Sequence, residues 1–257
     1  MKNIFLLIAL VFVFQSCQSK PPKDLAIKQV EANLTYSIAI SEKANHKAWD
    51  VLLKKYVDEN GFVNYKGFLN SKTELANYIN YLSENVPNEN WTIQEQLAYY
   101  INIYNALTVQ LILDNYPVNS IKDISKPWDQ TVITLNENNY SLGDIEHKIL
   151  RKMNEPRIHF AINCASYSCP ILLNEAFTAS KLEQQLEQVT DSFINGNKNE
   201  THPTNPKLSK IFKWYKKDFK VNGNADVIQF INQYSNVKIN EDASIDYLDY
   251  NWDLNQK

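Results

Sequence analysis

The chain has 257 residues and a formal net charge of −3 at pH 7, from 29 acidic and 26 basic side chains. This near balance argues against a dedicated nucleic-acid-binding protein, because such proteins gather positive charge to meet the phosphate backbone. Only 5 glycines and as many as 15 tyrosines indicate a tightly packed, largely helical body rather than a propeller or a glycine-rich barrel. The length suits a single large domain.

The first residues are typical of an export signal. Lys2 precedes an apolar run over residues 4–14, which is too short for an ordinary membrane span. The run is followed by Ser16 and Cys17, a junction that resembles the lipobox of bacterial lipoproteins, in which signal peptidase II cleaves before a lipid-modified cysteine. The sequence therefore predicts a signal peptide over residues 1–16 and lipidation at Cys17.

The residues after Cys17 suit a tether between a membrane and a folded domain. Residues 18–24 are polar and contain two prolines. They lack a run of acidic residues, so the sequence does not favour outward display at the cell surface. We expect a protein of the bacterial cell envelope, held to the membrane by lipid on Cys17 and facing the periplasm. Residues 17–43 then form the lipidated cysteine, tether and N-terminal extension, and residues 44–257 form one globular domain.

Helical patterns dominate the first half of that domain. The sequence predicts a helix from Leu25 to about Val57, a turn over residues 58–61, and an amphipathic helix from about Ser71 to Ser83.

The next helix, predicted from Thr92 to Tyr116, is apolar or aromatic in almost every direction around its axis, so we expect it to be buried in the centre. Thr92 and Glu95 have the spacing of a capping box, and a proline follows Tyr116. Asn102 and Asn105 share one face, and a buried amide without partners costs about 1 to 3 kcal/mol. These two side chains are expected either to pin a neighbouring loop or to line a site.

A hairpin and a short helix are predicted next. Residues 131–135 are rich in β-branched side chains, and the polar turn at 136–139 indicates a hairpin. Ser141 and Asp144 form a second capping box, which begins a helix that buries Leu142, Ile145 and Ile149 and leaves His147 off the apolar face.

Residues 157–163 alternate between apolar and polar or small side chains, which predicts a strand that ends at Asn163. Helices are then predicted over residues 179–194, 208–219 and 225–234, with an exposed polar loop at 195–206 and a terminal extended segment. The whole pattern predicts an α+β fold, a mostly helical single domain with a buried central helix and a small antiparallel sheet.

Five segments, taken in order, resemble the family called domain of unknown function 547. They are LAYYINIYNALTVQLIL, SLGDIEHKILR, PRIHFAINCASYSCPIL, LSKIFKWYKKDF and YLDYNWDLN, and the resemblance spans roughly residues 48–253. The family pattern carries histidines at the positions of His147 and His159 and cysteines at those of Cys164 and Cys169. The resemblance implies a family without implying a reaction.

The loop from Cys164 to Cys169 places two reactive side chains within a few residues of each other, and several interpretations of it stay open. In an oxidising compartment the two cysteines would form a disulfide that closes a small loop, with a stabilisation on the order of 2 kcal/mol. This interpretation favours a binding or structural module of the envelope, whose partner would be an envelope protein or cell-wall material.

The alternative is a thiol-dependent hydrolase or acyl transferase that acts on peptide or cell-wall material. Cys164 would be the nucleophile, His159 or His147 the base, and an amide would orient the base. The candidate amides are Asn102, Asn105 and Asn163. In a continuous strand His159 and Cys164 would lie on opposite faces, so the loop must fold back for them to meet.

Two further interpretations are a redox role for the cysteine pair and metal binding by His147, His159, Cys164 and Cys169. The cysteine spacing differs from the C-x-x-C of thioredoxin-like proteins, and the set of four matches no standard zinc motif. We therefore expect neither a metal nor another cofactor. His46 and His202 are predicted to lie on the surface.

Overall fold

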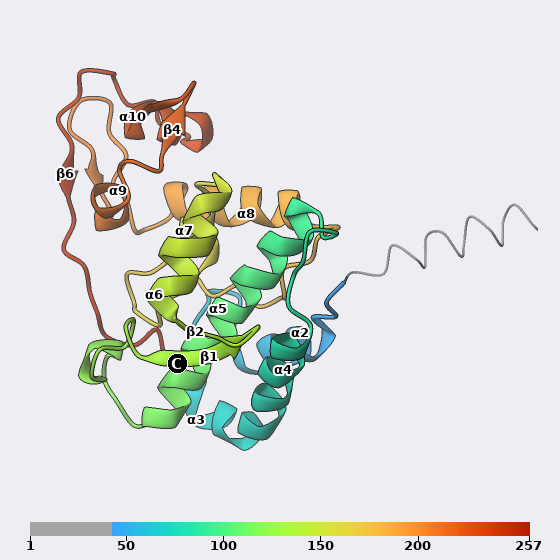
Figure 1. Ribbon diagram of the computed structural model, residues 1–257. Helices are drawn as coiled ribbons and strands as arrows, with labels where there is room; N and C mark the ends of the chain where they lie inside the picture. Colours follow the sequence, from blue (N-terminus) through green and yellow to red (C-terminus); the bar gives the residue numbers. More distant parts are fainter. Residues whose placement is uncertain (1–42) are drawn as a thin grey trace, which may run out of the picture. The chain divides into compact units, whose positions relative to one another are not determined.

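Helix α5, Ile93–Asn115, passes through the middle of the part of the chain that the computed structural model describes, residues 43–257 (Figure 1). Its N-terminus is closed by the predicted capping box: Thr92 accepts from the Glu95 N–H, and Glu95 accepts from the Thr92 N–H at 2.7 Å. Side chains on all sides of the helix are buried. The prediction of a capped, buried central helix is confirmed.

The signal peptide of residues 1–16, the lipid on Cys17, the tether and the expected helical start at Leu25 lie outside the described residues. Between residues 43 and 257 the structure contains no helix that is both long enough and apolar enough to span a membrane.

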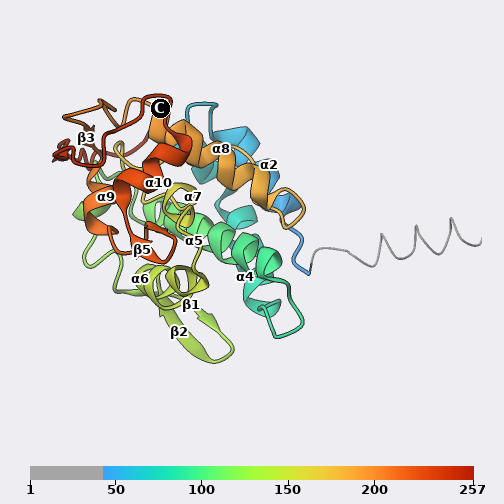
Figure 2. The same cartoon turned by 90° about the horizontal axis from the view of Figure 1, so that it is seen from above.

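Three helices form the first part of the domain: the first packs on the other two, and those two pack against α5. They are α2, Lys47–Tyr56, α3, Tyr65–Phe68, and α4, Lys72–Glu84. Trp49 of α2 is fully buried and stacks on Tyr78 of α4, with ring centroids 6.0 Å apart and 7° between the planes. In the view from above, α8, Leu182–Asn195, is drawn alongside α5 and does not cover it (Figure 2).

The predicted hairpin is present as β1, Thr131–Leu135, and β2, Asn138–Ser141. Its turn is tighter than the predicted one, because only Asn136 and Glu137 connect the strands, with φ values of 46° and 66°. Two successive positive φ values are what a two-residue hairpin turn requires. The hairpin supplies the small antiparallel sheet of a mostly helical α+β fold, as predicted.

Two smaller pairs complete the strands of the described chain. β3, Lys207–Leu208, is parallel to β6, Asp246–Tyr247, and β4, Lys220–Val221, is antiparallel to β5, Asn224–Ala225. The remaining helices of this region are α9, Lys210–Trp214, and α10, Val227–Tyr234.

The helix after the hairpin changes its winding twice. It begins as α6, Leu142–Asp144, behind the predicted Ser141 cap, continues as the π-helical turn η3, Ile145–Ile149, and ends as the 3₁₀ segment η4, Leu150–Met153. A π turn contains one more residue than an α turn and therefore rotates the following side chains. As a result Leu150 is fully buried, and Ile149, predicted to be buried, is only half-buried.

The predicted strand over residues 157–163 is wrong. Ile158–Ala161 form a single helical turn, α7, which begins two residues after Pro156, and only Ile162 and Asn163 continue in extended form. The alternation in the sequence does not separate a buried face from an exposed one here, because every residue from Ile158 to Asn163 is buried. A period of two has no structural meaning when both sets of side chains lie in the core.

The C-terminal segment lies against three parts of the chain that are distant in sequence. After β6 it descends along one side of the domain (Figure 1) and forms isolated bridges from Asp253 to Ser120, from Leu254 to Ser166 and from Gln256 to Val63. It therefore joins the first helices, the loop after α5 and the cysteine loop.

Candidate functional site

A cavity of about 360 Å³ lies beside the cysteine loop. Its lining comes from six regions of the chain: α5, the loop before β1, the π-helical turn η3, α7, the cysteine loop, and the segments from α9 to the C-terminus. This volume is within the range of sites that hold small molecules. The side chains that matter for its chemistry are Tyr104, Glu146, His147, His159, Cys164, Cys169, Trp214, Tyr250 and Trp252.

The amides of Asn105 and Asn163 shape the cysteine loop. Asn105 on α5 donates to the Ala161 carbonyl at 3.0 Å and accepts from the Asn163 N–H at 2.8 Å. The Asn163 side chain donates to the Pro170 carbonyl at 2.7 Å and accepts from the Ala165 N–H at 2.7 Å. Both amides act as structural clamps, and neither is among the residues that line the cavity.

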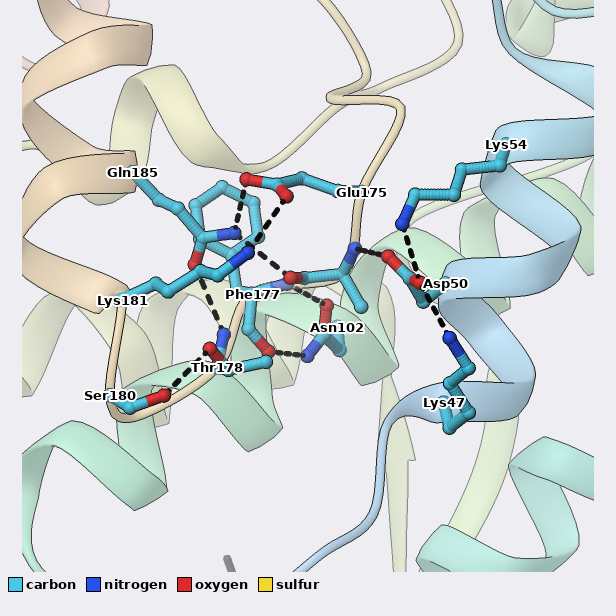
Figure 3. Close-up of polar contacts among 11 residues, drawn as sticks. Lys47, Asp50, Lys54, Asn102, Glu175, Phe177, Thr178, Ser180, Lys181 and Gln185 are labelled. Carbon is cyan, nitrogen blue, oxygen red and sulfur yellow. Dashed lines mark hydrogen bonds and ion pairs between the residues drawn. The ribbon is translucent and has the colours of Figure 1, made fainter.

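Asn102 holds a different segment (Figure 3). Its amide donates to the Phe177 carbonyl at 2.7 Å and accepts from the Phe177 N–H at 3.0 Å. At the preceding residue, Gln185 donates to the Ala176 carbonyl and Asp50 accepts from the Ala176 N–H. Asn102 therefore fixes the chain that leads into α8, and the structure does not bring it to the cysteine loop.

The two cysteines of the loop are in contact as free thiols. Their Sγ atoms lie 2.8 Å apart in a hydrogen bond, and the Cys164 N–H donates to Cys169 Sγ at 3.0 Å. The predicted disulfide is absent from this structure, because the separation of the sulfurs is longer than a covalent S–S bond of about 2.05 Å. The loop nevertheless brings the two sulfurs together, as that prediction required.

The two thiols have opposite environments. The hydrogen bond from Cys169, assisted by those of Tyr250 and Ser166, outweighs burial and lowers the pKa of Cys164 to about 7. Burial raises the pKa of Cys169 well above its ordinary value. Cys164 is half-buried, whereas Cys169 is only 6% exposed. Cys164 is therefore the accessible and more acidic thiol of the pair.

His159 is fixed by a carboxylate. Its side chain is 1% exposed, its Nε2 donates to Asp218 Oδ2 at 2.9 Å, and its ring stacks on Tyr215 at a centroid distance of 4.0 Å. Burial alone would raise the pKa of Asp218, but hydrogen bonds from His159 and Arg151 outweigh burial and hold it below its usual range. The Nε2–H of His159 is therefore used in its hydrogen bond to Asp218.

His147 lies at the edge of the cavity with its side chain 52% exposed. Among residues 43–257, no hydrogen bond joins an imidazole nitrogen to Sγ of Cys164 or Cys169. The structure thus brings both predicted histidines to the cavity of the predicted nucleophile, but it does not assemble a cysteine–histidine pair.

Several residues of the site were not predicted from the sequence. Glu146 lies at helical spacing from Leu142 and Ile149, so an acidic residue on an apolar face was the available signal. Tyr250 and Trp252 lie in the C-terminal segment that resembles the family pattern, but no chemistry was assigned to them. For Trp214 and Tyr104, only the large size of the side chain could have indicated that they belong to the site.

The two histidines that were predicted to lie on the surface differ in the structure. His46 was predicted to lie on the surface, but it is buried, with Nδ1 2.7 Å from the Tyr78 hydroxyl, and burial lowers its pKa to about 4. His202 is exposed, as predicted. Within the described part of the chain, no group of three or more His, Cys, Asp or Glu side chains could hold a metal ion.

The described chain is thus an α+β protein with a paired-thiol centre in a small cavity. Residues 88–194 match the sequence model of a family described as "Protein of unknown function, DUF547", and this match supports the family assignment that the motifs implied. The matched stretch contains α5, the hairpin and the cysteine loop, whereas Trp214, Tyr250 and Trp252 lie beyond it. No curated protein and no solved structure matches the chain.

Proposed function

We propose that the cavity is a site of thiol–disulfide exchange, with Cys164 as the attacking thiol and Cys169 as the resolving thiol. The observation that carries this proposal is the 2.8 Å contact between the sulfurs of an accessible Cys164 and a buried Cys169. The attacking species in such exchange is a thiolate, and a pKa near the ambient pH is the most effective value. The pKa of Cys164, about 7, meets that condition.

The chemistry needs only a substrate disulfide as the oxidant. The Cys164 thiolate attacks one sulfur of the substrate, its S–S bond breaks, and the first substrate thiolate leaves and takes up a proton. Cys169 then loses its proton and attacks Cys164 Sγ, which releases the second substrate thiol. The protein ends as the Cys164–Cys169 disulfide and the substrate as two thiols, so two electrons pass from the protein to the substrate.

Hydrolysis or acyl transfer by Cys164 is the second candidate, and it is favoured by the presence of His147 and His159 in the same cavity. Two features of the loop weigh against it. No imidazole is bonded to a cysteine sulfur in the described residues. The backbone N–H groups of Cys164, Ala165 and Ser168, which an oxyanion would need, already donate to Cys169, Asn163 and Asn251.

Trapping the mixed disulfide tests the exchange. The reduced protein is mixed with bis(2-hydroxyethyl) disulfide and analysed by intact mass spectrometry. The native chain should lose two hydrogens, C169S should retain one mercaptoethanol unit on residue 164, and C164S should remain unmodified. A C169S chain that gains no adduct, or a C164S chain that reacts as fast as the native one, would contradict the proposal.

The location in the bacterial cell envelope, with a lipid on Cys17, is also part of the proposal. It is supported by the apolar run over residues 4–14 and by the Ser16–Cys17 junction. Feeding cells a labelled fatty acid should label the native chain and leave C17S unlabelled. Label on both proteins, or on neither, would contradict lipidation at Cys17.

A further inference from the structure

One carboxylate oxygen in the cavity has no donor. Glu146 is 5% exposed, and its Oε1 makes no hydrogen bond among the described residues. Its other oxygen, Oε2, has only a long contact of 3.5 Å from the Tyr104 hydroxyl. A buried polar atom normally has a partner, and a carboxylate without one is costly. The structure thus contains an unsatisfied acceptor on a residue that lines the cavity.

The neighbouring imidazole of His147 does not supply the missing donor. His147 Nδ1 lies 3.6 Å from Glu146 Oε1 and 3.3 Å from Arg151 Nη1. A guanidinium has no acceptor, so Arg151 must be the donor in that contact, and Nδ1 must receive its hydrogen with a lone pair. An Nδ1 that accepts from Arg151 has no proton to donate to Glu146. A molecule in the cavity that carries a hydrogen-bond donor would supply a partner for this carboxylate.

An aromatic wall lines the same cavity. Trp214, Tyr250 and Trp252 pack on one another. The ring centroid of Tyr250 lies 4.9 Å from that of Trp214 and 4.5 Å from that of Trp252, and the centroids of the two tryptophan rings are 5.8 Å apart. Trp214 is 46% exposed, so part of its ring remains open. Lys122 Nζ already lies 5.0 Å from the centre of the Trp252 ring. Aromatic faces of this kind attract cations, and a neighbouring carboxylate adds to that attraction.

We propose that the cavity recognises an ammonium group, which pairs with the carboxylate of Glu146 while the apolar body of the same ligand packs on Trp214, Tyr250 and Trp252. Glu146 and Cys164 line one cavity, so a single small molecule can reach both. The inference rests on the proposed function in one respect. Thiol–disulfide exchange at Cys164, combined with an ammonium site in the same cavity, makes the substrate a disulfide that carries an amine.

A pair of ligands that differ mainly in charge tests the ammonium site. Calorimetric titration of the reduced native protein compares 2-phenylethylamine with its neutral analogue 2-phenylethanol. The amine should bind at least tenfold more tightly. In E146Q that preference should fall to about one, whereas E89Q, which makes the same change at an exposed residue, should keep it. Thermal unfolding of both variants verifies that they are folded.

Several results would overturn the ammonium site. They are equal affinity for the two ligands, no binding of either by the native chain, and a preference that survives in E146Q. The exchange reaction is tested separately with bis(2-hydroxyethyl) disulfide, which contains no amine. A protein that exchanges but shows no amine preference retains the proposed function and loses this inference. A protein that prefers the amine but does not exchange retains the ammonium site and loses the proposed function.

Discussion

Asn105 of the central helix accepts a hydrogen bond of 2.8 Å from the backbone N–H of Asn163, the residue directly before Cys164. The same amide donates to the Ala161 carbonyl at 3.0 Å, so one side chain fixes the chain on both sides of Ile162. Because Asn105 is 2% exposed, neither contact competes with bulk water. The geometry of the thiol pair therefore depends on a residue that does not line the cavity.

Asn105→Ala should destabilise the protein and disturb the thiols. It leaves a buried N–H and a buried carbonyl without partners, which costs on the order of 3 kcal/mol in free energy of unfolding. Urea denaturation measures that loss, and the pH dependence of Cys164 alkylation should change as well. Asn102→Ala is the matched control, because it removes an equivalent clamp at Phe177. If both variants alter alkylation equally, Asn105 has no special link to the thiol pair.

Cys169→Ala should make Cys164 less acidic. Cys164 has a pKa of about 7 chiefly because the Cys169 thiol donates to it, against an ordinary value of 9.0. Without that donor the pKa should rise, and the alkylation rate at pH 7 should fall by roughly tenfold as the thiolate fraction falls. The measurement is the rate of iodoacetamide modification between pH 5 and pH 10.

Tyr250→Phe provides the control for that experiment, since it removes the weaker hydrogen bond of the Tyr250 hydroxyl, 3.4 Å from Cys164 Sγ. It should shift the midpoint in the same direction by a smaller amount. A midpoint that stays near pH 7 in Cys169→Ala would show that the neighbouring thiol does not set the acidity of Cys164.

The protein should lose stability in mild acid because His46 is buried in its neutral form. Burial lowers its pKa from 6.5 to about 4, so between these values the unfolded chain takes up a proton that the folded chain does not. The stability contributed by neutral His46 is complete above pH 6.5 and is lost as the pH falls to 4, by about 3 kcal/mol. Urea denaturation of His46→Asn should show a correspondingly smaller loss between pH 7 and pH 4. The exposed His202→Asn should behave like the native chain, and equal losses in all three proteins would exclude His46 as the cause.

Gly61 should tolerate alanine poorly, for two reasons. Its φ is +77°, and an added Cβ would lie 2.5 Å from Cβ of Ile171, two residues after Cys169. Gly223 is the control, because its φ of +83° is similar but no atom lies within 4 Å of an added Cβ. Gly223→Ala should cost about 1 kcal/mol from backbone strain, and Gly61→Ala about 1 to 3 kcal/mol more from overpacking. Equal losses in thermal unfolding would mean that Ile171 moves aside freely.

Local signals predicted much of the fold. Thr92 with Glu95 and Ser141 with Asp144 marked helix starts that the structure confirms, because a capping box depends on residues three apart. The all-round apolar character of residues 97–113 correctly indicated burial. The paired asparagines were expected either to clamp loops or to line a site, and the structure shows clamps at both.

The rest depended on contacts between distant parts of the chain. Alternation over residues 157–163 suggested a strand, but Ile158 to Asn163 are all buried, so the alternation did not separate a buried face from an exposed one. His46 is buried because Tyr78 of α4 supplies a partner 32 residues away. Glu146 and Trp252 both line the cavity although they are far apart in sequence, and no local sequence pattern predicts that they lie close together.

The C-terminal bridges from Asp253, Leu254 and Gln256 have a consequence for the order of assembly. Residues 250–255 supply two aromatic side chains of the cavity and hold the backbone of residues 165–168. A ribosome synthesises these residues more than 80 positions after Cys164, so a nascent chain must carry both thiols before their enclosure exists. Contacts between such distant positions also slow folding. Newly made protein should therefore be most open to oxidation or alkylation at Cys169 before the final residues dock.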